Sequence, residues 1–509
     1  MNTRILILYL PSPNQKMLPT PCLGIAVLKG YLKRAGRDVR IDDIEMKYWE
    51  KDITTIPLLR SIVRKLPLWF NNPKKIFLNT RQVNRYLDFN IPHERMKKVM
   101  SEWEKLLIEP AASFTHIGVS VMTTEQLAAS LCFAKYLKEK YGVCIILGGS
   151  FMTQRMSLLL ECYSFIDYII VREGEVALDK LLGGEPLENI ENLLYRKGGE
   201  VKVNPLAAAY ADNMEPDFSD LPFSLYGQKD VIMVPYEASK GCKLNCSYCV
   251  PGKKPLYIKN PKTVVDEIER IKERYNVSYF SFSDNAINIS RDFSIRLCEE
   301  FIKRKLDIYW TAYFIIEDEP MSYFRLLKKA GCIQLRCGIE TLNEKLGHAM
   351  NRRIDPDVVS NALRKSSAVG IWNHLFFIMS YPGDTWRDVL KVLFFIISHK
   401  NFFKSATMSC FNISGIDQLM ENHKYASYQG TLICRKVWKE KRCGLVYRKY
   451  YDIFFYLKSI LFKWMLWACG IYFNNIFSAV KDPFNRRLYF YSAFYQWRTG
   501  DKHAAEDRM

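Results

Sequence analysis

Short apolar runs alternate with helical patterns through roughly the first 200 residues of the chain. This alternation is typical of parallel strands joined by crossover helices. Five parallel strands predict a doubly wound α/β sheet, which we expect to occupy residues 1–202. The expected strands are Arg4–Leu10, Val39–Ile44, His116–Val121, Cys144–Gly149 and Tyr168–Val171.

A long segment, about residues 47–113, separates the second and third of these strands. Its helical periodicity breaks at Pro57, Pro67, Pro73 and Pro92. Because a structureless loop of this length is unusual inside a domain, we expect a helical insertion.

The periodicity weakens over residues 203–230, where Pro205, Pro216 and Pro222 indicate a connection between domains. The strand and helix alternation then resumes over residues 231–414, and six strands predict a partial (β/α)6 barrel. Residues 415–509 have a helical and aromatic pattern, and we expect them to form a substrate-binding or capping region. The six expected strands are Val231–Ala238, Ser278–Ser283, Ile308–Phe314, Ile333–Ile339, Trp372–Ser380 and Ala406–Ile413.

Composition limits the classes of protein and partner. The 509 residues are 49% hydrophobic and 25% charged, which excludes a disordered or fibrous protein. With 73 basic and 54 acidic residues, the formal net charge is +19, and this favours an anionic partner. The basic residues are spread along the chain without an arginine-rich tail, so we do not expect nucleic acid to be that partner.

Two apolar segments were compared with the patterns of a signal peptide and of a membrane span. The run Arg4–Leu10 is followed by Pro11 and Pro13, so it lacks the features of a signal peptide and predicts a cytoplasmic protein. The run Trp464–Phe473 has 10 residues. A membrane span needs about 20. We expect a buried or amphipathic helix there, with contact to a membrane surface or a greasy substrate as the alternative.

Three of the 14 cysteines lie on one short polar segment, GCKLNCSYC, directly after an expected strand. Cys242, Cys246 and Cys249 have the spacing C-x3-C-x2-C, and three thiolates on one loop can bind a soft metal centre. A structural zinc ion would need a fourth ligand, and no second C-x2-C pair is nearby. Structural zinc and a chance group of buried cysteines remain the alternatives.

With Tyr248 as its aromatic residue, this motif resembles the signature of radical S-adenosylmethionine (SAM) enzymes. The resemblance implies that Cys242, Cys246 and Cys249 bind three irons of a [4Fe-4S] cluster and that SAM chelates the fourth. One electron from the cluster would then cleave SAM to methionine and a 5′-deoxyadenosyl radical. It also implies a small-molecule substrate and an electron donor such as flavodoxin or ferredoxin.

Three further segments resemble the same family. FSDNAI, with Asp284, stands where the family's backbone meets the SAM amino group, although the usual Gly-Gly-Glu is absent. LRCGIETLNEKLGHAMNR resembles the family's Gly-Ile-Glu-Ser strand and puts Glu340 at a strand end. FFIMSYPGDT, with Asp384, resembles a strand ending in Pro-Gly-Glu-Thr. A solvated carboxylate or a helix cap is the alternative for each of the three acidic residues.

The first domain resembles the flavodoxin-like cobalamin-binding domain that precedes the barrel in one branch of this family. The resemblance rests on the segments PCLGIAVLKGYLKRAG, IGVSV, ILGGS and REGEVALDKLL. It implies that cobalamin is bound near Ser120, Gly148, Gly149 and Gly174. The Asp-x-His-x-x-Gly motif that supplies a cobalt ligand elsewhere is missing, so cobalamin would be bound without a histidine from this loop. A domain that no longer holds a corrinoid is the alternative.

These resemblances predict a cobalamin-dependent enzyme that methylates an unactivated carbon of a biosynthetic small molecule, apolar or anionic. The alternatives are a radical cyclisation or rearrangement without methyl transfer, and a non-enzymatic metal-binding protein. Five aromatic residues of the last region could line a substrate cavity or form ordinary core. They are Trp438, Trp464, Trp467, Tyr489 and Trp497.

Overall fold

The computed structural model divides the chain into two compact units, residues 1–226 with 431–448, and residues 227–430 with 449–509. It describes residues 3–11, 20–48, 94–207, 210–211, 214–226, 231–249, 255–352, 354–379, 381, 383–411, 431–437, 442–448, 461–462 and 472–473. Most of the expected helical insertion, residues 49–93, lies outside these ranges.

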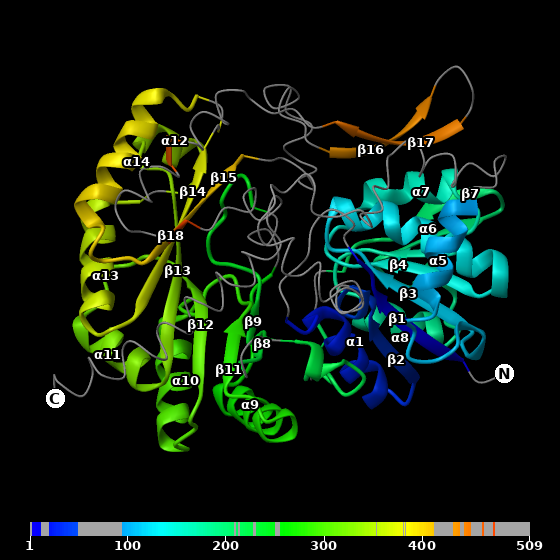
Figure 1. The fold of residues 1–509 in the computed structure, drawn as a ribbon, viewed down its shortest axis with the longest axis horizontal. Coiled ribbons are helices and arrows are strands. Elements are labelled where there is room, and N and C mark those ends of the chain that lie inside the picture. Colours follow the sequence, from blue (N-terminus) through cyan, green and yellow to red (C-terminus); the bar gives the residue numbers. More distant parts are fainter. Residues whose placement is uncertain are drawn as a thin grey trace, which may run out of the picture. The chain divides into compact units, whose positions relative to one another are not determined.

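The first unit is a seven-stranded sheet with helices on both faces (Figure 1). Its strands and α-helices are β1 (Arg4–Tyr9), α1 (Leu23–Arg34), β2 (Asp38–Asp43), α5 (Glu94–Glu104), β3 (His116–Ser120), α6 (Thr124–Tyr141), β4 (Cys144–Gly148), α7 (Ser157–Cys162), β5 (Tyr168–Ile170), α8 (Glu175–Leu182), β6 (Leu193–Lys197) and β7 (Glu200–Val203). Its short 3-10 helices are Ala111–Ser113, Gln154–Met156, Leu187–Asn189 and Phe223–Leu225.

The strand order is β2-β1-β3-β4-β5-β6-β7, and the first five strands are parallel. This is the doubly wound, flavodoxin-like arrangement that the apolar runs predict, so the predicted fold class is confirmed. Strand β1 reads as a continuous apolar run because helices cover both faces of the sheet and bury Ile5, Leu6, Ile7 and Leu8.

The antiparallel hairpin of β6 and β7 at the sheet edge was not predicted from the sequence. Gly198 and Gly199 form its turn, with φ of 63° and 83°. Two consecutive residues of positive φ are what a tight hairpin turn needs, and a Gly-Gly pair between short strands is the signal for it.

Residues 214–226, which fall within the expected interdomain connection, pack against α1 of the first unit. Lys29 Nζ lies 2.7 Å from Asp220 Oδ2, and each of these side chains is only 4% exposed. The amide of Asp217 donates to the carbonyl of Ala26 at 2.9 Å. A Cβ atom at Gly30 would lie 2.0 Å from the carbonyl oxygen of Glu215, so the close approach needs glycine there.

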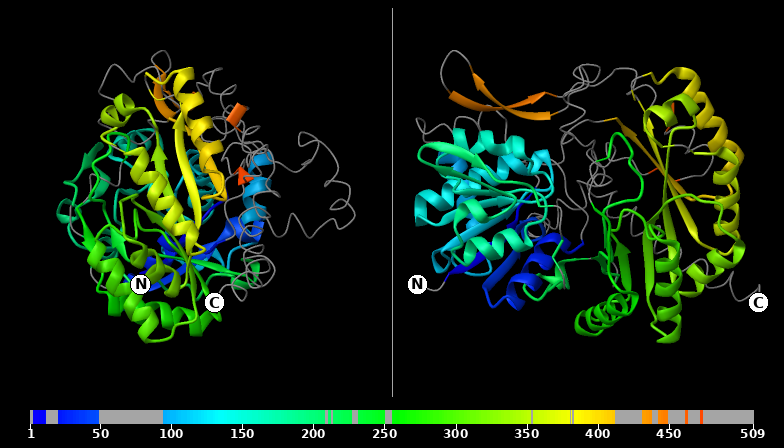
Figure 2. Two further views of the ribbon diagram at one scale, coloured as in Figure 1. Left: turned by 90° about the vertical axis from the view of Figure 1, so that its left-hand side faces the viewer. Right: turned by 180° about the vertical axis from the view of Figure 1, so that it is seen from behind.

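The second unit is a curved parallel sheet with its helices along one face (Figure 2). The strands are β8 (Met233–Tyr236), β11 (Tyr279–Phe282), β12 (Tyr309–Phe314), β13 (Cys332–Glu340), β14 (Trp372–Met379), β15 (Ser405–Cys410) and β18 (Tyr472–Phe473). The helices are α9 (Pro261–Tyr275), α10 (Arg291–Lys303), α11 (Met321–Lys329), α12 (Glu344–Ala349), α13 (Pro356–Ala368) and α14 (Trp386–His399). A short antiparallel pair, β9 (Ser239–Lys240) and β10 (Tyr257–Ile258), lies apart from this sheet.

The order β18-β15-β14-β13-β12-β11-β8 places the six expected strands side by side in chain order, as a partial barrel requires. Burial alternates along β13: Leu335, Cys337 and Ile339 are buried, whereas Arg336 and Gly338 are half-buried. The half-buried residues therefore face the inside of the barrel, and their buried neighbours face the helices.

Three segments of the last region form strands in place of the expected helical pattern, whereas residues 461 and 462 are helical. Residues Thr431–Val437 (β16) and Arg442–Arg448 (β17) form an antiparallel pair, and Tyr472 and Phe473 form β18 beside β15. Ile433, Val437 and Val446 are β-branched and favour strand conformations, which the sequence analysis underestimated. The aromatic residues proposed for a substrate cavity lie outside the described residues.

No helix among the residues that the structure describes is long and apolar enough to cross a membrane.

Candidate cofactor site

The cysteine loop follows β8 and β9 and is held by hydrogen bonds at both ends. Asn285 Nδ2 donates to the carbonyl of Gly241 at 2.6 Å. At the other end, the amide of Ser247 donates to the carbonyl of Met350 at 2.9 Å. The loop is thereby fixed to the end of β11 and to the end of α12.

Within the loop, Cys246 is buried and Cys242 and Cys249 are half-buried thiols. Burial raises the pKa of the Cys246 thiol, the other two cysteines raise it further, and Arg352 lowers it. The three sulfurs are thus close enough to interact electrostatically. A bound metal cluster would instead lower the pKa of these thiols, because positive metal charge stabilises thiolates.

No three of the described His, Cys, Asp and Glu side chains surround one point as the ligands of a single metal ion do. An iron–sulfur cubane presents a different requirement, because each thiolate binds a different iron. Three thiols on one anchored loop fit that requirement.

Glu340 ends strand β13 with a left-handed backbone, φ 64°, and its carboxyl is next to the cysteine loop. Burial raises the pKa of this carboxyl to about 7, while Arg352 and a hydrogen bond from Tyr248 act in the opposite direction. A Cβ atom at Gly338 would lie 2.4 Å from a carboxyl oxygen of Glu340, so glycine makes room for that side chain. The structure thus brings Tyr248, Glu340 and Cys246 together.

Arg352 was not singled out from the sequence. Its Nη2 donates to the carbonyl of Gly338 at 2.9 Å, and the residue is 9% exposed. In the sequence, basic residues just after a short helix suggest a solvated helix end, and only the fold shows that this cation lies beside Cys246 and Glu340.

Asp284 is completely enclosed between β11 and the segment after β8. It accepts hydrogen bonds from Ser239 Oγ at 2.6 Å and from the amide of Ala238 at 3.2 Å. Burial raises the pKa of this carboxyl to about 7. Its contacts make Asp284 a brace that holds the strand leading into the cysteine loop. Asp384 lies in the turn before α14, where its amide donates to the carbonyl of Tyr381 at 2.8 Å.

In the first unit, three of the four residues expected near cobalamin lie at the carboxyl ends of strands, and the fourth stands before a helix. Ser120 ends β3, Gly148 ends β4, Gly149 follows it, and Gly174 precedes α8. Gly149 has φ 103° and a Cβ there would lie 2.4 Å from the carbonyl oxygen of Val121, so the local backbone itself requires glycine. A Cβ at Gly148 would meet nothing closer than 3.7 Å, which leaves space at the strand end.

A cluster of buried polar side chains at the ends of β1 and β2 was also not predicted from the sequence. Tyr226 Oη donates to Asp43 Oδ2 at 2.7 Å, and Gln126 Nε2 donates to the carbonyl of Leu10 at 2.9 Å. Burial raises the pKa of the Asp43 carboxyl to about 6. Tyr226 belongs to the segment expected as a linker, so no short motif could reveal this contact.

An open parallel sheet, a partial parallel barrel and an anchored three-cysteine loop define a class of cofactor-dependent α/β enzymes. Residues 236–396 match the family model of the radical SAM superfamily. Residues 236–396 therefore form a radical SAM domain, and the resemblance seen in the cysteine motif is confirmed.

The curated relatives are identical to this chain at fewer than a third of the aligned positions. The chain is 23% identical over 284 residues to an uncharacterized methyltransferase of Pyrococcus horikoshii, covering 54% of this chain and 62% of the relative. It is 25% identical over 258 residues to the anaerobic magnesium-protoporphyrin IX monomethyl ester cyclase of Cereibacter sphaeroides, covering 47% and 42%. The chain thus spans about half the length of the curated relatives it matches.

Two solved structures share the fold. The radical SAM methyltransferase TsrM of Kitasatospora setae, solved with cobalamin and a [4Fe-4S] cluster, has a TM-score of 0.59 and 16% identity, covering 82% of this chain and 78% of TsrM. The cobalamin-dependent radical SAM enzyme OxsB, solved with aqua-cobalamin and SAM, has a TM-score of 0.54 and 18% identity, covering 78% and 52%.

Proposed function

We propose that this protein is a cobalamin-dependent radical SAM methyltransferase that acts on an unactivated carbon of a small molecule. The observation that carries the proposal is the anchored loop of three thiols beside Tyr248, Glu340 and Arg352. The shared fold with TsrM and OxsB supports the assignment of the first unit to cobalamin. Methyltransferases among the relatives support the reaction type.

In this proposal, Cys242, Cys246 and Cys249 would each hold one iron of a [4Fe-4S] cluster. The strand ends at Ser120, Gly148, Gly149 and Gly174 would hold the corrinoid. When bound, the cluster supplies the electron that cleaves SAM, and cobalamin supplies the methyl group.

The other residues of the site bind and orient. Arg352 places a guanidinium beside the cysteine loop, where it offsets the negative charge of thiolates. Tyr248 brings its hydroxyl beside Glu340, where it lowers the pKa of that carboxyl and favours the carboxylate. Asp284 and Asn285 hold the loop in position through Ser239 and Gly241. An electron donor such as flavodoxin or ferredoxin would be the protein partner.

The test uses anaerobically purified full-length protein reconstituted with iron and sulfide. We expect about four irons per chain and little zinc, and loss of that iron in the triple variant Cys242→Ala, Cys246→Ala, Cys249→Ala. The variant Cys144→Ala is the matched control, because this cysteine lies in strand β4 of the first unit. Full iron content in the triple variant, or zinc in place of iron in the wild type, would contradict the proposal.

A radical cyclase is the second candidate, because three of the matched relatives are cyclases of 25%, 27% and 23% identity. Reaction products separate the candidates. Methyl transfer yields S-adenosylhomocysteine together with 5′-deoxyadenosine, whereas a cyclase that uses SAM only for radical formation yields 5′-deoxyadenosine without S-adenosylhomocysteine.

A further inference from the structure

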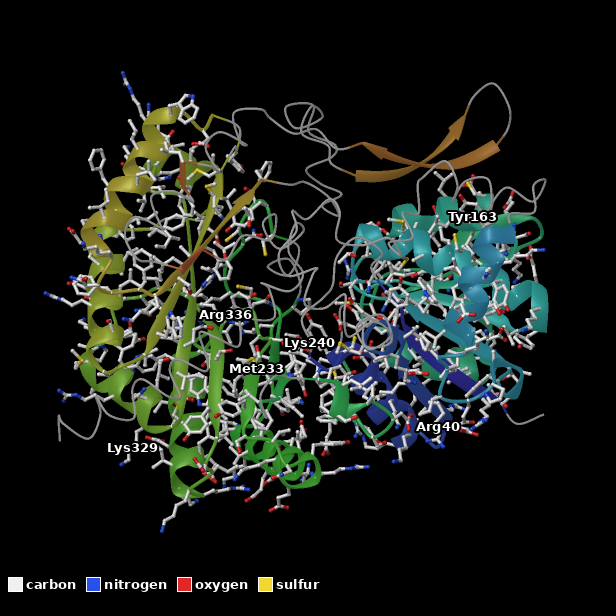
Figure 3. The ribbon with its side chains drawn as sticks, in the orientation of Figure 1. Arg40, Tyr163, Met233, Lys240, Lys329 and Arg336 are labelled. Atoms are coloured by element: carbon white, nitrogen blue, oxygen red, sulfur yellow. The ribbon has the colours of Figure 1, made fainter. Side chains whose placement is uncertain are left out.

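The inner face of the barrel holds a guanidinium that the cofactor site does not use. Arg336 lies on β13, four residues before Glu340, and Figure 3 marks it among the strands of the second unit. Its guanidinium carbon is 4.1 Å from the centre of the Tyr313 ring on β12. Its Nη2 donates to the carbonyl of Phe282 at 2.7 Å and to Ser281 Oγ at 3.2 Å. These contacts fix the side chain in one orientation.

Arg336 has no anionic partner within ion-pair distance among the residues that the structure describes. Its Nε is buried and has no hydrogen-bond acceptor there. The nearby carboxyl of Asp284 acts on Arg336 only through its field, since its oxygens accept from Ser239 and Ala238. Partly withdrawing a guanidinium from water without an anion in contact is costly, so an external anion would relieve this cost.

The neighbours of Arg336 on the next strand cannot supply that anion. His374 on β14 is hydrogen-bonded to Ser405 Oγ at 2.6 Å and to Thr407 Oγ1 at 3.0 Å. Burial and the charge of Arg336 lower its pKa to about 3, so the imidazole is neutral at physiological pH. The lining around the guanidinium is thus hydroxyl groups and a neutral ring.

Solvent reaches the inner face of the barrel near Arg336. Tyr313 is 37% exposed although it lies in a central strand, and Arg336 is half-buried. Phe376 stacks on Tyr313 with ring centres 5.9 Å apart. A ligand here would meet one fixed cation and two aromatic rings.

We propose that Arg336 binds a carboxylate or phosphate group of the small-molecule substrate, with Tyr313 and Phe376 beside the substrate's apolar part. An arginine fork suits both anions because two N–H groups can face two oxygens. At about 3.3 Å per strand residue, Arg336 is about 13 Å along β13 from Glu340, so the anion would anchor the substrate at a distance from the cysteine site. The inference rests on the proposed function for its assignment to a substrate.

The test measures binding of inorganic phosphate, and of acetate in parallel, to full-length protein at constant ionic strength, by calorimetry and by the shift in melting temperature. We expect saturable binding in the wild type, loss of at least about tenfold in affinity in Arg336→Gln, and partial retention in Arg336→Lys. The control Arg296→Gln, on the exposed face of α10, should bind as the wild type does. Equal binding by the wild type and Arg336→Gln, or no saturable binding at all, overturns the proposal.

If Arg336→Gln does not fold, Tyr313→Leu gives the same test, because it removes the ring that positions the guanidinium and should also weaken anion binding. Unchanged binding in that variant would overturn the proposed geometry.

A second arm separates a substrate anion from the carboxylate of SAM. The phosphate titration is repeated on reconstituted protein saturated with SAM. Binding that persists supports a substrate site, whereas binding that SAM abolishes overturns the substrate assignment. Neither titration requires SAM cleavage or cobalamin, so a failure of the proposed reaction would show separately, as missing iron or missing SAM products.

Discussion

Tyr248 on the cysteine loop lies beside Glu340 at the end of β13, and its hydroxyl lowers the pKa of the Glu340 carboxyl. The two residues are distant in the sequence, and Arg352 lies close enough to Cys246 and to Glu340 to lower the pKa of both. Glu340 is half-buried, and a partly buried acidic group is stabilised by a donor beside it.

We expect Tyr248→Phe to destabilise the second unit, because it removes the hydroxyl beside the half-buried carboxyl of Glu340. A lost donor to a buried group costs about 1–3 kcal/mol. Thermal unfolding and iron content after reconstitution measure the effect, with Tyr31→Phe on α1 as the control. A melting temperature equal to that of the wild type would show that the hydrogen bond contributes nothing.

We expect Gly149→Ala to destabilise the first unit by about 2–4 kcal/mol. Its backbone has positive φ, and the new Cβ would lie 2.4 Å from the carbonyl oxygen of Val121. The control Gly24→Ala places a Cβ in open space within α1 and should be neutral or stabilising. Chemical denaturation of both variants and the wild type measures their unfolding free energies. Equal stability of Gly149→Ala and the wild type would mean that the backbone can relax at Gly149.

We expect the size of the side chain at position 148 to determine corrinoid binding. Gly148→Ala adds a Cβ that meets nothing closer than 3.7 Å, so cobalamin should still bind. Gly148→Phe should fill the strand end and exclude it. The absorption of corrinoid that stays with the protein through gel filtration measures this, with circular dichroism to verify folding. Equal retention of corrinoid by Gly148→Phe and the wild type would show that the corrinoid does not bind at this edge of the sheet.

We expect His374 to make the second unit less stable as pH falls below about 6.5, the usual pKa of an unfolded histidine. The folded imidazole resists protonation down to a pKa of about 3, so the unfolded chain binds more protons between these values. Stability is therefore complete above pH 6.5 and declines toward pH 3, by up to about 1.4 kcal/mol per pH unit.

The measurement is urea unfolding of the wild type and His374→Gln between pH 7 and pH 5. The difference between their unfolding free energies should shrink as pH falls, while His348→Gln, whose side chain is 49% exposed, should run parallel to the wild type. Parallel curves for all three proteins would contradict the expected linkage.

The parallel strands of the first unit could be predicted because helices cover both faces of its sheet, which leaves apolar runs such as Ile5–Leu8 in the sequence. The β6 and β7 hairpin was missed because its edge position gives a weak pattern, although Gly198 and Gly199 carry the turn signal. The C-terminal strands were missed because their aromatic surroundings suggested helix.

The site was partly predictable for a different reason. Cysteine spacing is local, so the thiols could be found without a fold. The roles of Arg336 and Arg352 depend on residues that are distant in the sequence. Arg336 contacts Tyr313 on another strand, and Arg352 lies beside Cys246 on another loop. Asp284 was expected near SAM, and its contacts to Ser239 and Ala238 could only be seen in the fold.

The contact between Lys29 and Asp220 decides where the chain can be divided for separate production of its halves. A fragment that stops at residue 202 would leave the Lys29 ammonium, 4% exposed, without its counter-ion and would uncover the side of α1 that residues 214–226 protect. A cut after Tyr226 keeps the ammonium neutralised, so soluble expression of the N-terminal half should depend on those two dozen residues.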